Sequence, residues 1–299
     1  MRINKLKAAA MCCVLLFLWE NDIKAEKTEI SEAMSLGEGI AWNVYAEAES
    51  VEFEINGRSE TVTDYTETNG RKRFVFRGMG PKMLADELTV TAHLSGGKTR
   101  VHKISAREYL IKNYGKSEAL DALTDALLSY GAAVQIYENY RTDCLACNIG
   151  TGTVPENSDT VTYIDYDGIY TPAVEFLGAS VILGDIITVS LHAEALNEDG
   201  FNGKYLNVYL SGNSFGTPKV TNISAKESVF SFGMAPTRYS DIITAYFADE
   251  TGTKLSPVLT YSVKSYIARM YGKTSDPDLK NLLSAFEDYC AAAEKYVCG

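Results

Sequence analysis

The sequence predicts an α+β protein of two tandem homologous domains, each an antiparallel β-sandwich-like sheet region followed by a helical hairpin. Three observations support this prediction. Short alternating segments separated by glycine-containing turns open each half of the 299-residue chain. An amphipathic helical stripe closes each half, and motifs of the first half recur in the second. Strands that precede helices, without alternating with them, indicate an α+β class.

The recurring motifs appear in the same order in both halves. The turn at 78–81 with Asp86 recurs 155 residues later at 233–236 with Asp241, and Tyr114-Gly115-Lys116 recurs at 271–273. The apolar positions 120, 123, 127, 130, 134 and 137 recur 159 residues later. The separation between matching residues grows from 155 to 159 along the chain, and small loop insertions account for this growth. A repeat of this length is typical of a duplicated domain, because each copy can bury a core of its own.

Alternating β-branched and aromatic residues predict strands in both halves. Asn56-Gly57, Asn69-Gly70 and Gly96-Gly97 supply the positive φ angles that tight hairpins require. The expected strands are 40–46, 51–55, 73–76, 88–94 and 99–104, then 187–191, 206–210, 229–232, 242–247 and 258–261. No helical pattern is interleaved with them, which favours an antiparallel sandwich.

Each strand region is followed by a helical pattern. Residues 106–113 predict a short helix, and Ser117 is expected to cap a longer helix that reaches about residue 140. In the second half Asp276-Pro277 marks the start of the matching helix, whose stripe runs from 279 to 296. The simplest partner for each stripe is its own short helix plus one face of its sandwich.

Residues 1–25 have the layout of a secretory signal peptide. Basic residues precede an apolar run at 8–19, and Ile23 and Ala25 stand at positions −3 and −1 of a cleavage before Glu26. The run is shorter than the roughly 20 residues of a membrane-spanning helix. We therefore expect a secreted protein, at most loosely associated with the cell surface and not inserted in a membrane after cleavage. The alternative is an uncleaved interfacial anchor.

The remaining chain divides into two modules. The first is expected at 30–140 and the second at 161–299, because residues 141–160 are rich in Gly, Ser, Thr and Asn and have no periodicity. We interpret 141–160 as an interdomain linker. Each module is then expected to fold on its own.

Four cysteines remain after cleavage, and export would permit disulfides between them. Structural disulfide candidates are Cys144, Cys147, Cys290 and Cys298, for which three full pairings are open. Cys144 and Cys147 have the spacing of a redox motif but follow a helix, whereas reactive cysteines stand at a helix start. A linker disulfide, or bridges from this pair to Cys290 and Cys298, is favoured. A zinc site shared by all four is the last alternative.

The motifs also resemble a known kind of module. The sequence Tyr-Gly-Ala-Ala-Val-Gln at 130–135 closes the first helical region, and its counterpart at 289–294 departs at Cys290 and Glu294. Together with the glycine-Met-Gly/Ala-Pro turns, this resembles a module of large secreted and surface proteins of anaerobic gut Gram-positive bacteria. The resemblance implies an extracellular setting beside adhesion or polysaccharide-associated parts. It lends no catalytic residue.

Composition and motifs exclude several chemistries. A net charge of −11 opposes binding to nucleic acid, which needs clustered Lys and Arg. The sequence has no nucleophile elbow, phosphate-binding loop or dinucleotide fingerprint. His93 and His102 could face each other across a hairpin, but no third metal ligand lies nearby. We read Asp86 and Asp241 as turn residues that bond the backbone, and we expect no cofactor, no metal and no enzymatic activity.

Aromatic side chains are the best candidates for a binding site. The chain has 19 tyrosines, and Trp42 is the sole tryptophan after cleavage. Tyr205 and Tyr209 share one face of a predicted strand. The full set of candidates is Trp42, Tyr163, Tyr166, Tyr170, Tyr205, Tyr209 and Tyr239. Exposed Tyr and Trp pair apolar area with a polar tip and so suit sugar rings or protein partners.

These observations favour a secreted, non-catalytic adhesion-type protein that recognises an extracellular glycan or protein through its β-domain surfaces. Two linked domains could bind bivalently. One alternative is an extracellular polysaccharide-active hydrolase whose paired carboxylates the sequence does not reveal. The other is a purely structural spacer of a surface protein.

Overall fold

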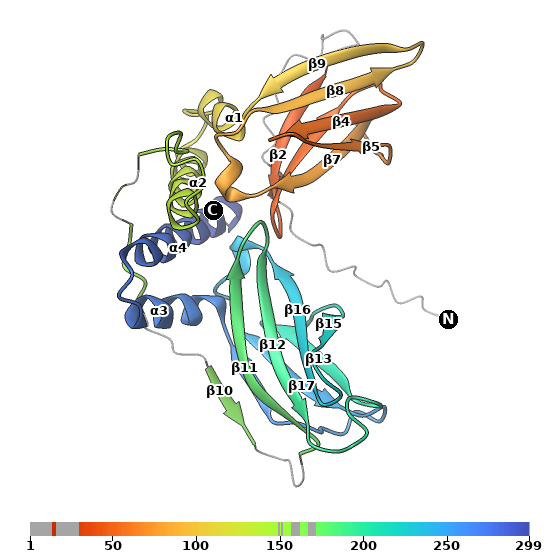
Figure 1. The fold of residues 1–299 in the computed structure, drawn as a ribbon, viewed down its shortest axis with the longest axis vertical. Helices are drawn as coiled ribbons and strands as arrows, with labels where there is room; N and C mark the ends of the chain where they lie inside the picture. The colour runs from red at the N-terminus through yellow and green to blue at the C-terminus, as the bar shows by residue number, and fades with distance from the viewer. Residues whose placement is uncertain are drawn as a thin grey trace. The chain divides into compact units, whose positions relative to one another are not determined.

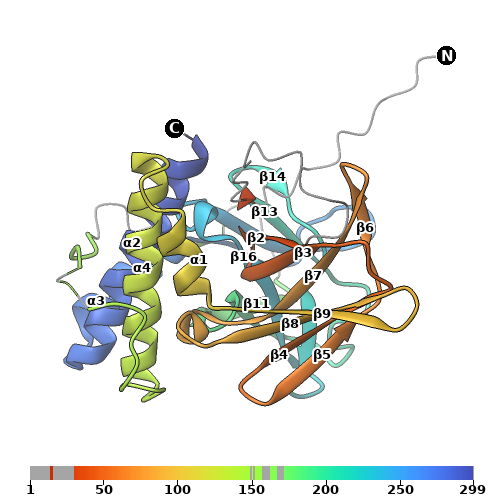
Figure 2. The same ribbon diagram turned by 90° about the horizontal axis from the view of Figure 1, so that it is seen from above.

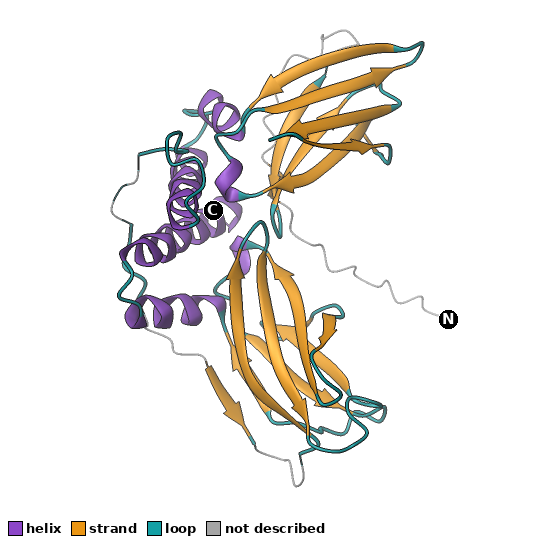
Figure 3. Cartoon of the chain, viewed as in Figure 1, coloured by secondary structure: helices purple, strands orange, loops and turns teal. Residues whose placement is uncertain are grey.

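The chain forms two compact units, residues 1–113 and 114–299, which we describe separately. The structure is a computed structural model that describes residues 14–15, 30–148, 150, 152–156, 162–166 and 172–298. Both units combine helices with strands (Figure 3). In unit 1 the described helix follows the strands in the chain, whereas in unit 2 one described helix precedes the strands and two follow them. This confirms the predicted mixed α+β class with antiparallel sheets.

Unit 1 packs two antiparallel sheets as two layers (Figures 1 and 2). One sheet has the order β1-β2-β3-β7-β6 and the other β5-β4-β8-β9. The strands are β1 (Val14–Leu15), β2 (Ser31–Leu36), β3 (Ile40–Tyr45), β4 (Ser50–Ile55), β5 (Arg58–Val62), β6 (Thr66–Thr68), β7 (Arg71–Met79), β8 (Leu88–Leu94) and β9 (Lys98–Ile104). A short 3₁₀ turn, η1 (Pro81–Met83), and one helix, α1 (Ala106–Lys112), complete the unit.

The core of unit 1 lies between its two sheets. Val51, Phe53 and Ile55 alternate inward along β4 and are at most 2% exposed. Phe53 stacks on Phe76 of the opposite sheet with ring centroids 4.9 Å apart. The helix α1 begins at Ala106, as the pattern predicted, after a capping box at Ser105. The ring of its Tyr109 meets Trp42 edge-on at 5.2 Å. Burial on both faces of β3 follows from this packing.

Unit 2 has two further antiparallel sheets and the remaining helices. The sheet orders are β11-β12-β16-β15 and β10-β18-β17-β13-β14. The strands are β10 (Thr162–Asp165), β11 (Val174–Leu183), β12 (Ile187–Ala195), β13 (Tyr205–Leu210), β14 (Asn213–Ser214), β15 (Lys219–Asn222), β16 (Glu227–Met234), β17 (Ile243–Ala248) and β18 (Val258–Tyr261). The 3₁₀ turn is η2 (Pro236–Arg238), and the helices are α2 (Glu118–Tyr137), α3 (Val263–Lys273) and α4 (Pro277–Cys298).

The two long helices of unit 2 lie side by side (Figures 1 and 2). Tyr130 of α2 stacks on Tyr289 of α4 at 5.4 Å and meets Phe286 edge-on. The amide of Gln135, fully buried, donates to the carbonyl of Cys144 and accepts from the N–H of Ala146. The stripe of α2 is therefore buried against α4.

The boundary between the two compact units falls at 113–114, whereas the sequence predicts an interdomain linker at 141–160.

The two sandwiches share one strand order. The strand order β2-β3-β7-β6 in one sheet of unit 1 matches the order β11-β12-β16-β15 in unit 2. In the other sheet, the order β5-β4-β8-β9 matches β14-β13-β17-β18. The pairing registers also match, because Ser50 pairs with His93 where Tyr205 pairs with Ala248. Unit 2 adds β10 beside β18. These matched registers allow positions in the two units to be compared one by one.

Much of the predicted signal peptide lies outside the described residues, which include only β1 of that segment, paired with β2. Among the described residues, no helix is long and apolar enough to span a bilayer.

Candidate functional site

One outward sheet face of unit 2 gathers aromatic side chains. Along β13, Val208 and Leu210 point into the core and are nearly inaccessible, whereas Tyr205 and Tyr209 point outward. This alternation is the ordinary consequence of the two-residue side-chain period of a strand. It places the two tyrosines on the same face, as the sequence predicted.

A stacked tyrosine pair forms the centre of this face. The rings of Tyr209 and Tyr246 lie nearly parallel, with centroids 6.0 Å apart, an interplanar angle of 13° and their hydroxyls 3.3 Å apart. The hydrogen bond with Tyr209, and then partial burial, raises the pKa of the Tyr246 phenol. The ammonium of Lys254 lies 5.3 Å from the Tyr246 centroid. The two rings therefore present a nearly flat, stacked pair.

Sequence reasoning missed Tyr246. The register of β13 with β17 pairs Asn207 with Tyr246 and Tyr209 with Thr244, so Tyr246 lies diagonally beside Tyr209. Residues on diagonal positions of neighbouring strands remain within reach of aromatic side chains. The outward alternation of 243–248 was visible in the sequence, but not the strand to which it would pair.

Two more tyrosines extend the face. Tyr205 is 54% exposed, and its hydroxyl donates to Glu250 Oε1 at 3.4 Å. Tyr163 on the edge strand β10 is 56% exposed. It lies in one row with Tyr209, because Tyr163 pairs with Thr260, Thr260 with Thr244, and Thr244 with Tyr209. Three strand spacings separate the ends of that row, about 14 Å. We call Tyr163, Tyr205, Tyr209 and Tyr246 the tyrosine face.

The other aromatic candidates do not join this face. Trp42 is 0% and Tyr239 3% exposed, so neither forms an exposed platform, and the prediction was wrong for both. Trp42 is enclosed because α1 covers its strand, and the Tyr239 hydroxyl instead donates to the buried Glu287 Oε1. Tyr166 is exposed just after β10, and Tyr170 lies outside the described residues.

The same positions in unit 1 carry no aromatic residue. Where unit 2 has Asn207, Tyr209 and Tyr246, the matched register of unit 1 places Glu52, Glu54 and Thr91. Glu52 is hydrogen-bonded to Ser59 and lies 3.7 Å from His93. The outward face of unit 1 is therefore acidic and hydroxylated, and the tyrosine face is particular to unit 2.

The described cysteines form no disulfide. Cys144, Cys147 and Cys290 are free thiols, which corrects the predicted disulfide framework at these positions, and the side chain of Cys298 lies outside the described residues. Cys290 is buried within α4, where burial raises the pKa of its thiol well above the ordinary range. The Cys147 thiol points to Ser129 Oγ at 3.7 Å. Helix packing separates Cys290 from solvent.

The histidines of unit 1 do not face each other. His93 pairs with Thr99 and His102 with Val90, because the hairpin register offsets them. His102 Nδ1 instead lies 2.8 Å from Glu32 Oε1. Within the described residues, no group of three or more His, Cys, Asp or Glu side chains could hold a metal ion.

The repeated aspartates stand beside hairpin turns. Asp86 accepts from the Asn56 side chain at 2.7 Å, and Asp241 accepts from Ser211 Oγ at 2.9 Å. Asn56 and Ser211 both have positive φ, of 52° and 47°, and each opens a tight turn before a glycine. Each aspartate therefore ties the end of a β-hairpin to the turn that follows η1 or η2, a structural role.

Comparisons with known proteins add no family. The chain matches no protein-family model and no curated protein.

Proposed function

We propose that the protein is a secreted, non-catalytic binding protein that recognises an extracellular glycan through the tyrosine face of unit 2. The observation that carries this proposal is the stacked pair of Tyr209 and Tyr246 on an outward sheet face, flanked by the exposed Tyr205 and Tyr163. Tyrosine rings offer apolar area for the C–H faces of sugar rings and hydroxyls for their polar edges.

Polar groups around the tyrosine face suit the hydroxyl groups of a glycan. Asn207 lies between Tyr205 and Tyr209, and Glu250 and Lys254 stand at the rim. These groups offer amide, carboxylate and ammonium partners for hydroxyl groups.

An extracellular setting is supported by residues 1–25 and by charge. The basic start, the apolar run and the small residue before Glu26 are typical of export. A pI of 4.9 opposes binding to nucleic acid, which needs clustered Lys and Arg.

We further propose that the two sandwiches are copies of one module and that only the second acquired the tyrosine face. Equal strand order and equal register support this interpretation. Tyr130 and Tyr289 occupy equivalent places in the repeat, 159 residues apart, and stack on each other. In this interpretation the modules are 30–140 and 161–299, and the second helix of each belongs to one shared helical layer.

The test is binding of the chain from Glu26 onward to an immobilised panel of plant, host and bacterial-wall glycans. We expect saturable binding that Tyr209→Ala or Tyr246→Ala weakens about tenfold, through lost ring area and stacking. Tyr137→Ala, at a tyrosine of α2 that is 45% exposed, is the matched control and leaves binding unchanged. Retention of full affinity in both face variants would overturn the proposal.

A blank panel would favour the alternatives. Capture of a purified extracellular matrix protein, lost in the same two variants, would identify a protein ligand on the same face. Release of reducing ends from a polysaccharide would instead support the hydrolase alternative.

A further inference from the structure

The matching sheets of the two units differ at one edge. In unit 2, β10 pairs antiparallel with β18 over Thr162–Asp165. In unit 1 the equivalent strand is β9, and within the described residues no strand pairs with its outer side. One sandwich therefore has its edge covered where the other presents unpaired backbone groups.

The inward positions of the two strands also differ. Val90, Ala92 and Leu94 of β8 stand opposite His102, Arg100 and Lys98 of β9. Since Val90 and Ala92 are fully buried, their β9 partners share the core-facing side of the sheet, yet they carry positive or protonatable groups. On β18, Leu259 and Tyr261 are 2% and 0% exposed. Inward charges on an edge strand are a known device against pairing of like strands.

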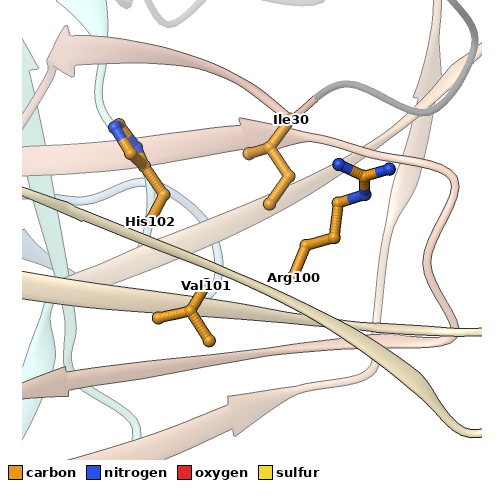
Figure 4. A pocket seen from close by; sticks show the side chains of 4 residues that line it. All are labelled: Ile30, Arg100, Val101 and His102. Atoms are coloured by element: carbon orange, nitrogen blue, oxygen red, sulfur yellow. The ribbon is translucent and has the colours of Figure 1, made fainter.

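A hollow of about 400 Å³ runs beside β9, lined by Ile30, Arg100, Val101 and His102. Arg100 and His102 project to the side of Ile30, whereas Val101 projects to the opposite side (Figure 4). Because side chains from both faces of β9 line it, the hollow follows the strand edge. Unit 2 has β10 along the matching edge.

The edge has one sign of charge. β9 carries Lys98, Arg100, His102 and Lys103 and no acidic residue, in a chain of net charge −11. Lys103 pairs with Glu87, and His102 with Glu32, whose side chain is 7% exposed. Lys98 and Arg100 are exposed. The edge therefore repels a second copy of itself and attracts a negatively charged strand.

We propose that the free edge of β9 binds an extended acidic peptide segment as an added antiparallel strand, in the place that β10 takes on β18. Backbone hydrogen bonds supply the affinity, as in other strand-addition complexes. Acidic side chains on alternate positions face Lys98 and Arg100, and the apolar side chains between them lie beside Val101 on the opposite face of the strand. This site is in unit 1 and is independent of the tyrosine face.

The test uses a fluorescent synthetic peptide in which isoleucine and threonine alternate with glutamate. We expect saturable anisotropy changes with the full chain, weakened by added salt. Amide hydrogen exchange of 98–104 should slow on binding, and that of β15, an edge strand of unit 2, should not. Arg100→Glu should weaken binding about tenfold by replacing attraction with repulsion.

Two controls separate strand addition from charge attraction. The same peptide methylated at alternate backbone nitrogens keeps its charge but cannot extend the sheet, and it should not bind. Lys219→Glu, at an exposed basic residue of β15, should bind as the unmodified protein does. Binding of the methylated peptide, equal loss in Lys219→Glu and Arg100→Glu, or no binding at all would overturn the proposal.

Discussion

The two sandwiches have the same strand order and register but present different outward faces. Along β4 and β13 the inward positions are apolar in both units, with Val51 and Phe53 in unit 1 where unit 2 has Leu206 and Val208. Outward positions are not, since Glu54 stands where unit 2 has Tyr209. The shared scaffold therefore depends on the inward residues, whereas the outward residues differ between the units.

The largest expected effect is on stability and concerns the inward residues. Phe53→Ala removes a fully buried ring that stacks on Phe76, and should cost about 3–5 kcal/mol of stability through lost burial and a cavity. Glu54→Ala, at the next and outward position, should change stability by less than about 0.5 kcal/mol. Chemical denaturation of both variants measures the difference. Equal costs would contradict the separation of roles.

Exchanging outward residues between the two units tests their role in binding. Placing the unit 1 residues at the matched positions, as Tyr209→Glu with Tyr246→Thr, should abolish glycan binding and leave circular dichroism unchanged. The stacked pair disappears, while β13 and β17 keep their inward residues. Binding that survives this double exchange would mean that the tyrosine face is not the glycan-binding site.

The paired helices allow a third comparison. Gln135→Ala on α2 leaves the Cys144 carbonyl and the Ala146 N–H without their buried partner, at about 1–3 kcal/mol. Glu294 of α4, 159 residues after Gln135, accepts from Ser240 Oγ in an exposed hydrogen bond, so Glu294→Ala should cost little. Alkylation of Cys144 and Cys147 should quicken in Gln135→Ala alone. Equal rates in both variants would argue against this role.

The smallest expected effect is pH-dependent. Glu287 is 9% exposed where the equivalent position of α2 is Leu128, and burial raises the pKa of its carboxyl, against the opposing influence of Lys264 and Tyr239. A raised pKa means that folding disfavours the ionised form. Stability is then lost as pH rises from the ordinary glutamate range through the raised folded value.

Glu287→Gln removes this titration. It should be more stable than the parent near pH 7 and show no such gain at pH 3, as measured by thermal unfolding at both pH values. A constant difference between the two proteins across this pH range would contradict the assignment.

Local patterns in the sequence predicted much of the fold. Every predicted strand is present, from 40–46, observed as β3, to 258–261, observed as β18. Ser117 caps its helix with a hydrogen bond, as predicted. These features succeed because alternation, turn chemistry and capping depend on residues only a few positions apart.

Polar edge strands escaped the same reasoning. β5 is exposed at four of its five residues, and β15 at all four, so neither shows an apolar alternation. A strand of this kind is stabilised mainly by the neighbour to which it pairs. Its hydrophobic pattern therefore does not predict that it is a strand.

By itself, the sequence determined the mixed α+β class, the recurring motifs and the outward direction of Tyr205 and Tyr209. The tertiary structure alone brought Tyr246 beside Tyr209, buried Trp42, packed α2 on α4 and left Cys144 and Cys147 as free thiols. The physical reason is that each of these depends on contacts between segments far apart in the chain. The side-chain period of a strand predicts on which face a residue lies, but not which residues of other segments it contacts there.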